Sequence, residues 1–195
     1  MRRLVAVCAV AVLACGPARA LHLSEQGGVA YLSGSIEEGA ADRMRDFLAQ
    51  KRAQPIRILY LYSPGGMVSE AIAIGDMIRK AGLATAVDAG RAYCDSACTM
   101  VFAAGVRRHY VNADRMEEGL AGHFGLGFHL SRTKGDARTP AMKSEAGSDK
   151  MRAYYARMGV PRAIDLCQRA AINTLYRPGG RTALAMGIAT SLAAP

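Results

Sequence analysis

The segment spanning residues 56–80 constrains the fold of this 195-residue chain most strongly. Residues 56–62 (IRILYLY) form a short, β-rich apolar run that is typical of a buried strand. The tight turn SPGG follows at residues 63–66, and residues 67–80 then place apolar side chains at helical spacing. A buried strand that leads through a turn into an amphipathic helix is the building unit of α/β proteins.

The same alternation of short apolar strands and helices continues along the chain. Further strands are predicted at 28–36, 85–87, 107–111 and 122–126, and further helices at 37–50, 150–158, 161–172 and 182–186. Residues 92–105 combine a strand end, a turn and a small-residue helix, and the polar residues 128–148 are predicted to form a loop or a frayed helix start. We therefore expect an α/β fold with a mainly parallel sheet flanked by helices.

The first twenty residues (MRRLVAVCAVAVLACGPARA) have the pattern of a secretory signal peptide, with an arginine-rich start that indicates a bacterial protein. Two arginines precede an unbroken apolar run, and Ala18-Arg19-Ala20 is a small-x-small cleavage signal. Cleavage after Ala20 would leave a single domain over residues 21–195, exported to the periplasm or secreted. Two alternatives remain open. Cys15 follows Val-Leu-Ala as in a lipoprotein signal and would then carry a membrane tether, or the segment stays as an uncleaved anchor.

The charge pattern argues against nucleic acid as a partner. The net charge is +9, and the first twenty residues hold three of the 25 basic residues and none of the 16 acidic ones, which leaves +6. These charges are scattered apart from Arg107-Arg108, and aromatic residues make up only 6%, which is thin for a protein that stacks on bases. The chain contains no phosphate-binding P-loop motif, and no cofactor is predicted.

Three cysteines follow the predicted signal peptide: Cys94, Cys98 and Cys167. An oxidising compartment permits disulfides, so either Cys94 and Cys98 pair locally, or one of them pairs with Cys167, or all three are buried thiols. A zinc site usually shows paired Cys-x-x-Cys or nearby histidine ligands. This spacing does not match that pattern, so no metal is predicted.

Three short segments contain the candidate chemistry. The backbone N–H groups of the SPGG turn would attract negative charge, as an oxyanion hole requires, although such turns are also common strand-to-helix connections. Ser96, within YCDSAC, lies where an extended run gives way to a helix, so it is either a nucleophile or a helix N-cap, a role that Asp95 could also fill. His123 and His129 lie in the glycine-rich GHFGLGFH, and one of them would serve as a general base unless both are structural.

The order and spacing of these segments resemble the Clp protease proteolytic subunit and its wider Clp/crotonase superfamily. In that family a strand ends in SPGG, a second strand-to-helix turn presents the nucleophilic serine between small residues, and a histidine follows. Here Ser96 follows Gly66 by 30 residues, and His123 follows Ser96 by 27. The resemblance extends over residues 28–188, and CDSAC with GVRR is similar to exported Clp-like proteins of bacteria. It implies a Clp/crotonase-like spiral of ββα units.

The resemblance also implies roles for four residues. Ser96 would be the nucleophile and His123 the general base that takes its proton. The backbone N–H groups of Gly66 and Ala97 would hold the oxyanion that forms when a carbonyl is attacked.

The resemblance is incomplete at the third member of the catalytic triad. Asn173 stands about where the family has an aspartate, and an asparagine can orient an imidazole but supplies no negative charge. Asp165, eight residues earlier, is an alternative. Signal peptide peptidases of similar fold use a Ser–Lys dyad instead, which would assign the base to Lys143 or, as the preferred alternative, Lys150.

These features lead us to expect an exported serine hydrolase, specifically a peptidase acting on peptide or protein substrates. One alternative is a catalytically silent Clp-like binding or assembly module, and another is a crotonase-like enzyme that uses only the oxyanion hole on a thioester. Clp-type domains commonly form rings through a helical handle, which would lie within residues 128–159. Because that stretch is polar and contains glycine, a heptamer is not expected, and a smaller homo-oligomer or a monomer stays open.

Overall fold

The computed structural model describes residues 20–133, 135 and 139–195. The predicted signal peptide, with Cys15, lies outside the described residues apart from Ala20, so cleavage, lipidation and export stay predictions. Within the described residues, no helix is both long enough and apolar enough to cross a membrane.

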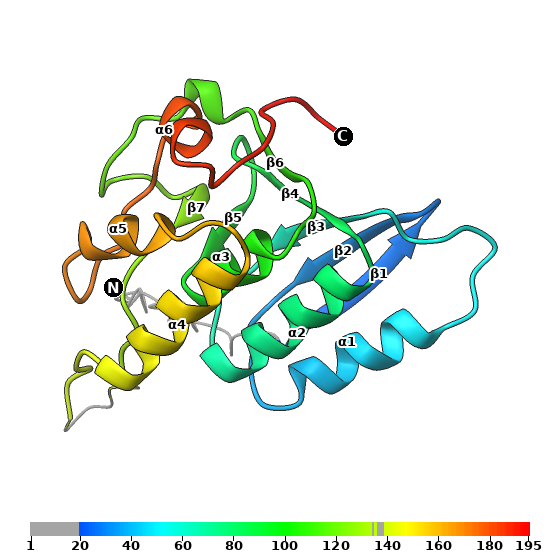
Figure 1. Cartoon of the computed structure of the whole chain (residues 1–195), viewed down its shortest axis with the longest axis horizontal. Coiled ribbons are helices and arrows are strands. Elements are labelled where there is room, and N and C mark those ends of the chain that lie inside the picture. The colour runs from blue at the N-terminus through cyan, green and yellow to red at the C-terminus, as the bar shows by residue number, and fades with distance from the viewer. Residues whose placement is uncertain (1–19, 134, 136–138) are drawn as a thin grey trace, which may run out of the picture.

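The main sheet has five strands in the order β1-β2-β3-β4-β6 (Figure 1). These strands are β1 His22–Gln26, β2 Val29–Ser33, β3 Ile58–Tyr62, β4 Ala84–Asp88 and β6 Arg108–Val111. Strands β2, β3, β4 and β6 run parallel to one another, and β1 pairs antiparallel with β2 at the edge of the sheet. The predicted α/β fold with a mainly parallel sheet is therefore confirmed.

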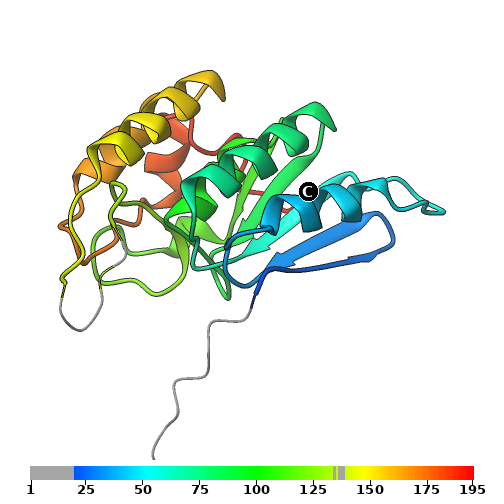
Figure 2. The same cartoon turned by 90° about the horizontal axis from the view of Figure 1, so that it is seen from below.

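Helices α1 and α2 lie side by side against one face of this sheet (Figure 1, Figure 2), and α2 also packs against α3 and α4. The helices are α1 Ala40–Ala49, α2 Val68–Lys80, α3 Ala97–Ala103, α4 Glu145–Arg157, α5 Ala163–Gln168 and α6 Gly180–Ala185, with a 3₁₀ turn η1 at Ala113–Arg115. The core lies between the two layers. Leu59 and Leu61 of β3 are buried there, as are Ile74 and Ile78 of α2, because the strand period of two and the helix period of 3.6 both direct apolar side chains to this interface.

Strand β1 and the start of helix α4 differ most from the sequence-based prediction. Strand β1 was not predicted, because its sequence HLSEQ is largely polar and its side chains are alternately exposed and half-buried, as suits an edge strand. Helix α4 begins at Glu145, inside the stretch for which a loop or a frayed helix start was predicted, because the Ser144 hydroxyl caps it by accepting a hydrogen bond from the Gly147 N–H.

A second, two-stranded parallel sheet positions the candidate chemistry. It consists of β5 Tyr93–Asp95 and β7 Gly125–Gly127. Cys94 of β5 also forms a parallel bridge with Ser63, which directly follows β3. The small sheet therefore adjoins the carboxyl end of β3, and the SPGG turn, the Ser96 turn and the glycine-rich segment meet in one region.

Candidate active site

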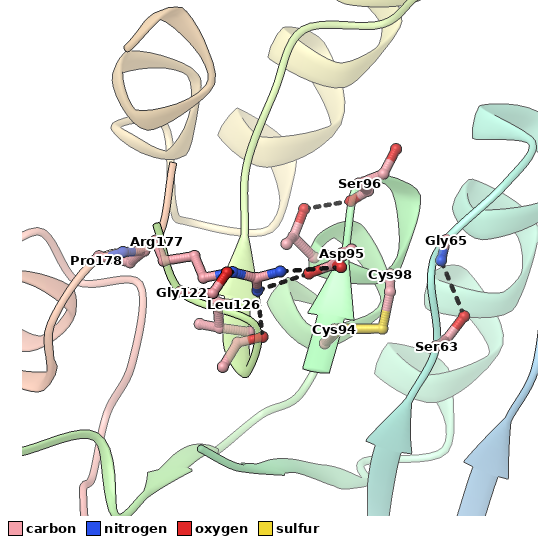
Figure 3. A network of polar contacts seen from close by, with 12 residues as sticks. Ser63, Gly65, Cys94, Asp95, Ser96, Cys98, Gly122, Leu126, Arg177 and Pro178 are labelled. Atoms are coloured by element: carbon pink, nitrogen blue, oxygen red, sulfur yellow. Dashed lines mark hydrogen bonds and ion pairs between the residues drawn. A yellow bond between two sulfur atoms is a disulfide. The ribbon is translucent and has the colours of Figure 1, made fainter. Parts of the chain in front are cut away.

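Ser96 joins β5 to α3 in a conformation that non-glycine residues rarely adopt, with φ 55° and ψ −125°. Its N–H donates to the Gly127 carbonyl (2.8 Å), and its own carbonyl accepts from the Thr99 N–H (2.9 Å) and hydroxyl (2.6 Å). Ser96 occupies the N-cap position of α3, as one of the alternatives predicted, but its side chain makes no capping hydrogen bond. The hydroxyl points away from the neighbouring polar network (Figure 3). A serine held at such a strand-to-helix turn has the backbone arrangement of a nucleophile elbow.

The SPGG turn lies directly against the Ser96 turn. A Cβ atom at Gly65 would stand 2.8 Å from Ala97 N and 2.9 Å from Ser96 Cβ, so only glycine allows this close approach. Gly65 also has a φ of 85°, which glycine adopts without strain. Ser63 fixes the turn, because its buried hydroxyl donates to the Gly34 carbonyl (2.6 Å) and accepts from the Gly65 N–H (3.1 Å). The tertiary structure thus brings together the first two predicted segments.

The backbone N–H groups of Gly66 and Ala97 belong to these two adjoining turns. Ala97 is the first residue of α3, where an N–H group has no acceptor within the helix. Gly66 is exposed. Within the described residues, neither N–H donates a hydrogen bond to the protein. An oxyanion hole requires such unpaired N–H donors on neighbouring turns.

Asp95, the residue before Ser96, forms a buried two-pronged ion pair with Arg177 (Figure 3). Nη1 lies 2.7 Å from Oδ1 and Nη2 lies 3.1 Å from Oδ2. The same guanidinium donates to the carbonyls of Gly122 (2.7 Å) and Gly125 (3.2 Å), so it links the Ser96 turn to the glycine-rich segment. Burial raises the pKa of the Asp95 carboxyl, and the hydrogen bonds and charge of Arg177 oppose that rise.

Sequence reasoning missed Arg177 altogether and considered Asp95 only as a helix cap. The two residues lie 82 positions apart, and neither belongs to a motif that would link them. Gly127 offered an indirect signal, since a Cβ atom there would collide with the Asp95 carboxylate. That requirement becomes visible only once β5 and β7 are paired.

A disulfide joins Cys94 to Cys98, with an S–S distance of 2.02 Å, and so brackets Ser96. Cys167 is a buried free thiol. Of the alternatives left open by the sequence, local pairing of Cys94 with Cys98 is therefore the one observed. Both bonded cysteines are fully buried, one in β5 and the other in α3.

His123 and Asn173 are both exposed, and both line a cavity of about 500 Å³ beside the ion pair. Tyr93, Asp95 and Arg177 line the same cavity, together with the apolar side chains of Leu120, Phe124 and Leu175. Ser96 is not among the lining residues. The structure thus brings the predicted base and the predicted third residue together, and the role of His123 toward Ser96 stays a prediction.

His129, in contrast, is buried. In the sequence it follows Gly127, whose carbonyl accepts the Ser96 N–H, by two residues. Its Nδ1 lies 2.6 Å from the Leu130 carbonyl oxygen. Because a carbonyl oxygen only accepts hydrogen bonds, Nδ1 must carry the proton. The lone pair of Nε2 is then available to accept a proton. Burial, and then the nearby charge of Arg132, lower the pKa of His129 and favour its neutral form.

The alternative catalytic residues from the sequence are all exposed. Lys143 lies just before α4, Lys150 lies on the outer face of α4, and Asp165 lies on the outer face of α5. A lysine that acts as a base requires burial to release its proton near neutral pH, and neither lysine has such an environment.

Comparison with known proteins defines the fold. No family model matches the sequence, and no curated protein matches it either. Solved structures do match. One is the 1510-N membrane-bound stomatin-specific protease as a serine-to-alanine mutant, with a TM-score of 0.60, 13% identity, and 85% of this chain and 78% of that chain covered.

A lysine-to-alanine mutant of the same protease, in complex with a substrate peptide, matches with a TM-score of 0.59 and 15% identity. In that case 85% of this chain and 74% of the other are covered. Identities this low establish the fold and not the activity. The chain therefore shares the α/β fold of this protease, as expected from the sequence.

Proposed function

We propose that this chain is an exported serine hydrolase of the peptidase class, with Ser96 as its nucleophile. The conformation of Ser96 carries the proposal: it has a positive φ on a strand-to-helix turn, its hydroxyl caps no helix, and unpaired N–H groups lie on the adjoining turns. Such a conformation costs about 1–3 kcal/mol and is found mainly at functional sites. Similarity in fold to a protease in complex with a substrate peptide supports the peptidase class.

In the proposed reaction, Ser96 Oγ attacks the carbonyl carbon of a peptide bond while an imidazole accepts the hydroxyl proton. The N–H groups of Gly66 and Ala97 stabilise the oxyanion of the tetrahedral intermediate. The imidazolium then donates its proton to the leaving amine, which leaves an acyl-enzyme. Water, deprotonated by the same imidazole, hydrolyses the acyl-enzyme and restores Ser96.

We assign the base to His129 and keep His123 as the alternative. His129 is buried, has a lowered pKa, and has its tautomer set by the Leu130 carbonyl, so Nε2 is free to accept a proton. In this assignment the carbonyl performs the orienting role that a triad carboxylate has elsewhere. In the alternative, Asn173 would orient His123, since the two line the same cavity.

The first test is covalent labelling of the purified protein with a fluorophosphonate, which reacts with activated serines. We expect wild-type protein to be labelled and Ser96→Ala to be unlabelled, because no other serine lies at a strained turn beside unpaired N–H groups in the described chain. Ser24→Ala, an exposed change on β1, serves as the control and should label normally. Labelling that survives in Ser96→Ala contradicts the proposal.

The second test separates the two histidines. We expect His129→Ala to lower the labelling rate by about 10²–10⁴-fold, the usual contribution of general-base catalysis, and His123→Ala to change it little. The wild-type rate should fall only at a pH below 6.5, the ordinary histidine value, because the pKa of His129 is lowered. The reverse pattern of mutant effects would assign the base to His123.

The same lowered pKa affects stability. Above pH 6.5 neither the folded nor the unfolded chain protonates this imidazole appreciably, so its full contribution to stability is present. As the pH falls, the unfolded chain takes up the proton first, and the folded state loses stability. Urea unfolding at a series of pH values should therefore give a steeper loss below pH 6.5 for wild type than for His129→Ala.

Export belongs to the same proposal and is supported by the Cys94–Cys98 disulfide, since stable disulfides form mainly in oxidising compartments. We propose peptide or protein substrates, and a small homo-oligomer stays part of the proposal. Fractionation of cells that express the full chain would test export, and a lipid on Cys15 would be detected by mass spectrometry.

A catalytically silent binding module is the second candidate. Its support is the absence of Ser96 from the cavity that His123, Asn173 and the ion pair line, which leaves that cavity available to a ligand without chemistry. Folded wild-type protein that resists labelling by the fluorophosphonate would favour this candidate over the hydrolase.

A further inference from the structure

The disulfide of this protein closes a very short loop around the candidate nucleophile. Cys94 is the second residue of β5 and Cys98 is the second residue of α3, and Ser96 stands at the midpoint between them. The bond therefore ties the strand to the helix across the turn that carries Ser96. Closing so short a loop constrains the unfolded chain less than closing a long one, so its main effect is on local geometry.

Local geometry is what this turn requires. A serine has no intrinsic preference for a φ of 55° and reaches it only where its surroundings impose it. Three contacts hold Ser96: its N–H hydrogen bond to the Gly127 carbonyl, the hydrogen bonds from Thr99 to its own carbonyl, and the Cys94–Cys98 disulfide across the turn. Without the disulfide, β5 and α3 can shift relative to each other, and Ser96 can relax to a negative φ.

We infer that the Cys94–Cys98 disulfide is a positioning element that holds Ser96 in its reactive backbone conformation. This inference rests on the proposed function, since it assigns the disulfide to the same reaction. The bond acts through Ser96 and Ala97, by fixing the direction of the hydroxyl and of the first N–H group of α3. It contacts no reacting atom in this scheme.

Burial protects the Cys94–Cys98 disulfide from reduction in the folded protein. Both cysteines are fully buried, so a reductant has no access to either sulfur in the folded protein. The third cysteine does not compete, because burial raises the pKa of Cys167 to about 12 and keeps it a thiol, whereas exchange requires a thiolate. The disulfide is therefore formed as the protein folds and is retained, and it does not act as a reversible switch.

The test compares wild type with Cys94→Ala/Cys98→Ala, and uses Ser24→Ala, an exposed change on β1, as the control. If the alanine pair does not fold, Cys94→Val/Cys98→Val restores the buried volume. The first readout is amide hydrogen exchange, measured by NMR, at Ser96 and Thr99 relative to Leu61 of β3. The second is the rate of fluorophosphonate labelling well below the melting temperature of each variant.

We expect amide exchange at Ser96 and Thr99 to become at least about tenfold faster without the disulfide, while exchange at Leu61 is unchanged. Labelling should slow by about 10–100-fold, since small displacements at a reacting group have effects of that size. Ser24→Ala should leave both readouts within about twofold of wild type, as expected of an exposed site on the edge strand.

Unchanged exchange at Ser96 and Thr99 overturns the inference, whatever the labelling. Faster exchange together with labelling at the wild-type rate also overturns it, because the disulfide would then have no effect on the reactivity of Ser96. If wild-type protein itself is not labelled, the proposed hydrolase fails. The exchange readout still decides whether the disulfide holds the conformation of Ser96, so the two failures are distinguishable.

Discussion

Arg177→Ala should lower the free energy of unfolding by about 3–5 kcal/mol, the usual cost of removing one partner from a buried ion pair. Arg177 is only 3% exposed, and it supplies both hydrogen bonds to the Asp95 carboxylate. Its removal would leave that carboxylate buried without a counter-charge, and the carbonyls of Gly122 and Gly125 would lose a donor. Urea unfolding followed by circular dichroism would measure the loss.

The matched control is Arg157→Ala, which breaks an ion pair with Asp76 whose side chains are 54% and 46% exposed. An exposed pair of this kind contributes about 0–1 kcal/mol. Asp95→Ala/Arg177→Ala should lose less stability than Arg177→Ala, because no charge is then left buried alone. A loss for Arg177→Ala as small as that of the control would show that the buried pair is not a structural requirement.

Gly65→Ala should disrupt the candidate site and lower the free energy of unfolding by about 2–4 kcal/mol. Its Cβ would stand 2.8 Å from Ala97 N and 2.9 Å from Ser96 Cβ, which is closer than packed atoms tolerate, and would collide with the Asp95 carbonyl. The SPGG turn must then move away from the Ser96 turn. We expect fluorophosphonate labelling to slow by about a hundredfold.

Gly82→Ala separates backbone strain from collision. Gly82 also has a positive φ, of 67°, but nothing lies within 4 Å of the position that its Cβ would take. It should therefore show only the strain of a left-handed residue, about 1–2 kcal/mol, and label at the wild-type rate. Equal behaviour of the two variants, in stability and in labelling, would mean that the close approach at Gly65 is not needed for reactivity.

Both predictions arise from the way in which the candidate site is assembled. Three turns or strands contribute to it, and a buried arginine joins two of them from the far end of the chain (Figure 3). Two of these segments carry a glycine where another backbone or side chain approaches closely, Gly65 in the SPGG turn and Gly127 in β7. Stability and reactivity are therefore coupled at this site, because the same contacts that bury Asp95 also orient the Ser96 turn.

Local patterns were sufficient to predict most of the fold. The apolar run before SPGG, and the helical spacing after it, predicted β3 and α2 to within two residues at either end. Both signals are local, since strand and helix periods depend only on which neighbours share a face. The prediction failed at β1, whose polar sequence becomes a strand only because β2 offers an edge to pair with. At the start of α4 the prediction left a loop and a frayed helix start open, and the structure shows a helix start capped by Ser144.

The sequence by itself determined the alternation of strands and helices, the strand-to-helix turn at Ser96 and the SPGG turn after β3, because each depends on residues that are neighbours in the chain. Only the tertiary structure decided which cysteines pair, that the SPGG turn lies against the Ser96 turn, that Arg177 joins Asp95, and that His129 is buried while His123 is exposed. Those outcomes depend on strand pairing and on burial. They connect positions up to 82 residues apart, and no local pattern encodes them.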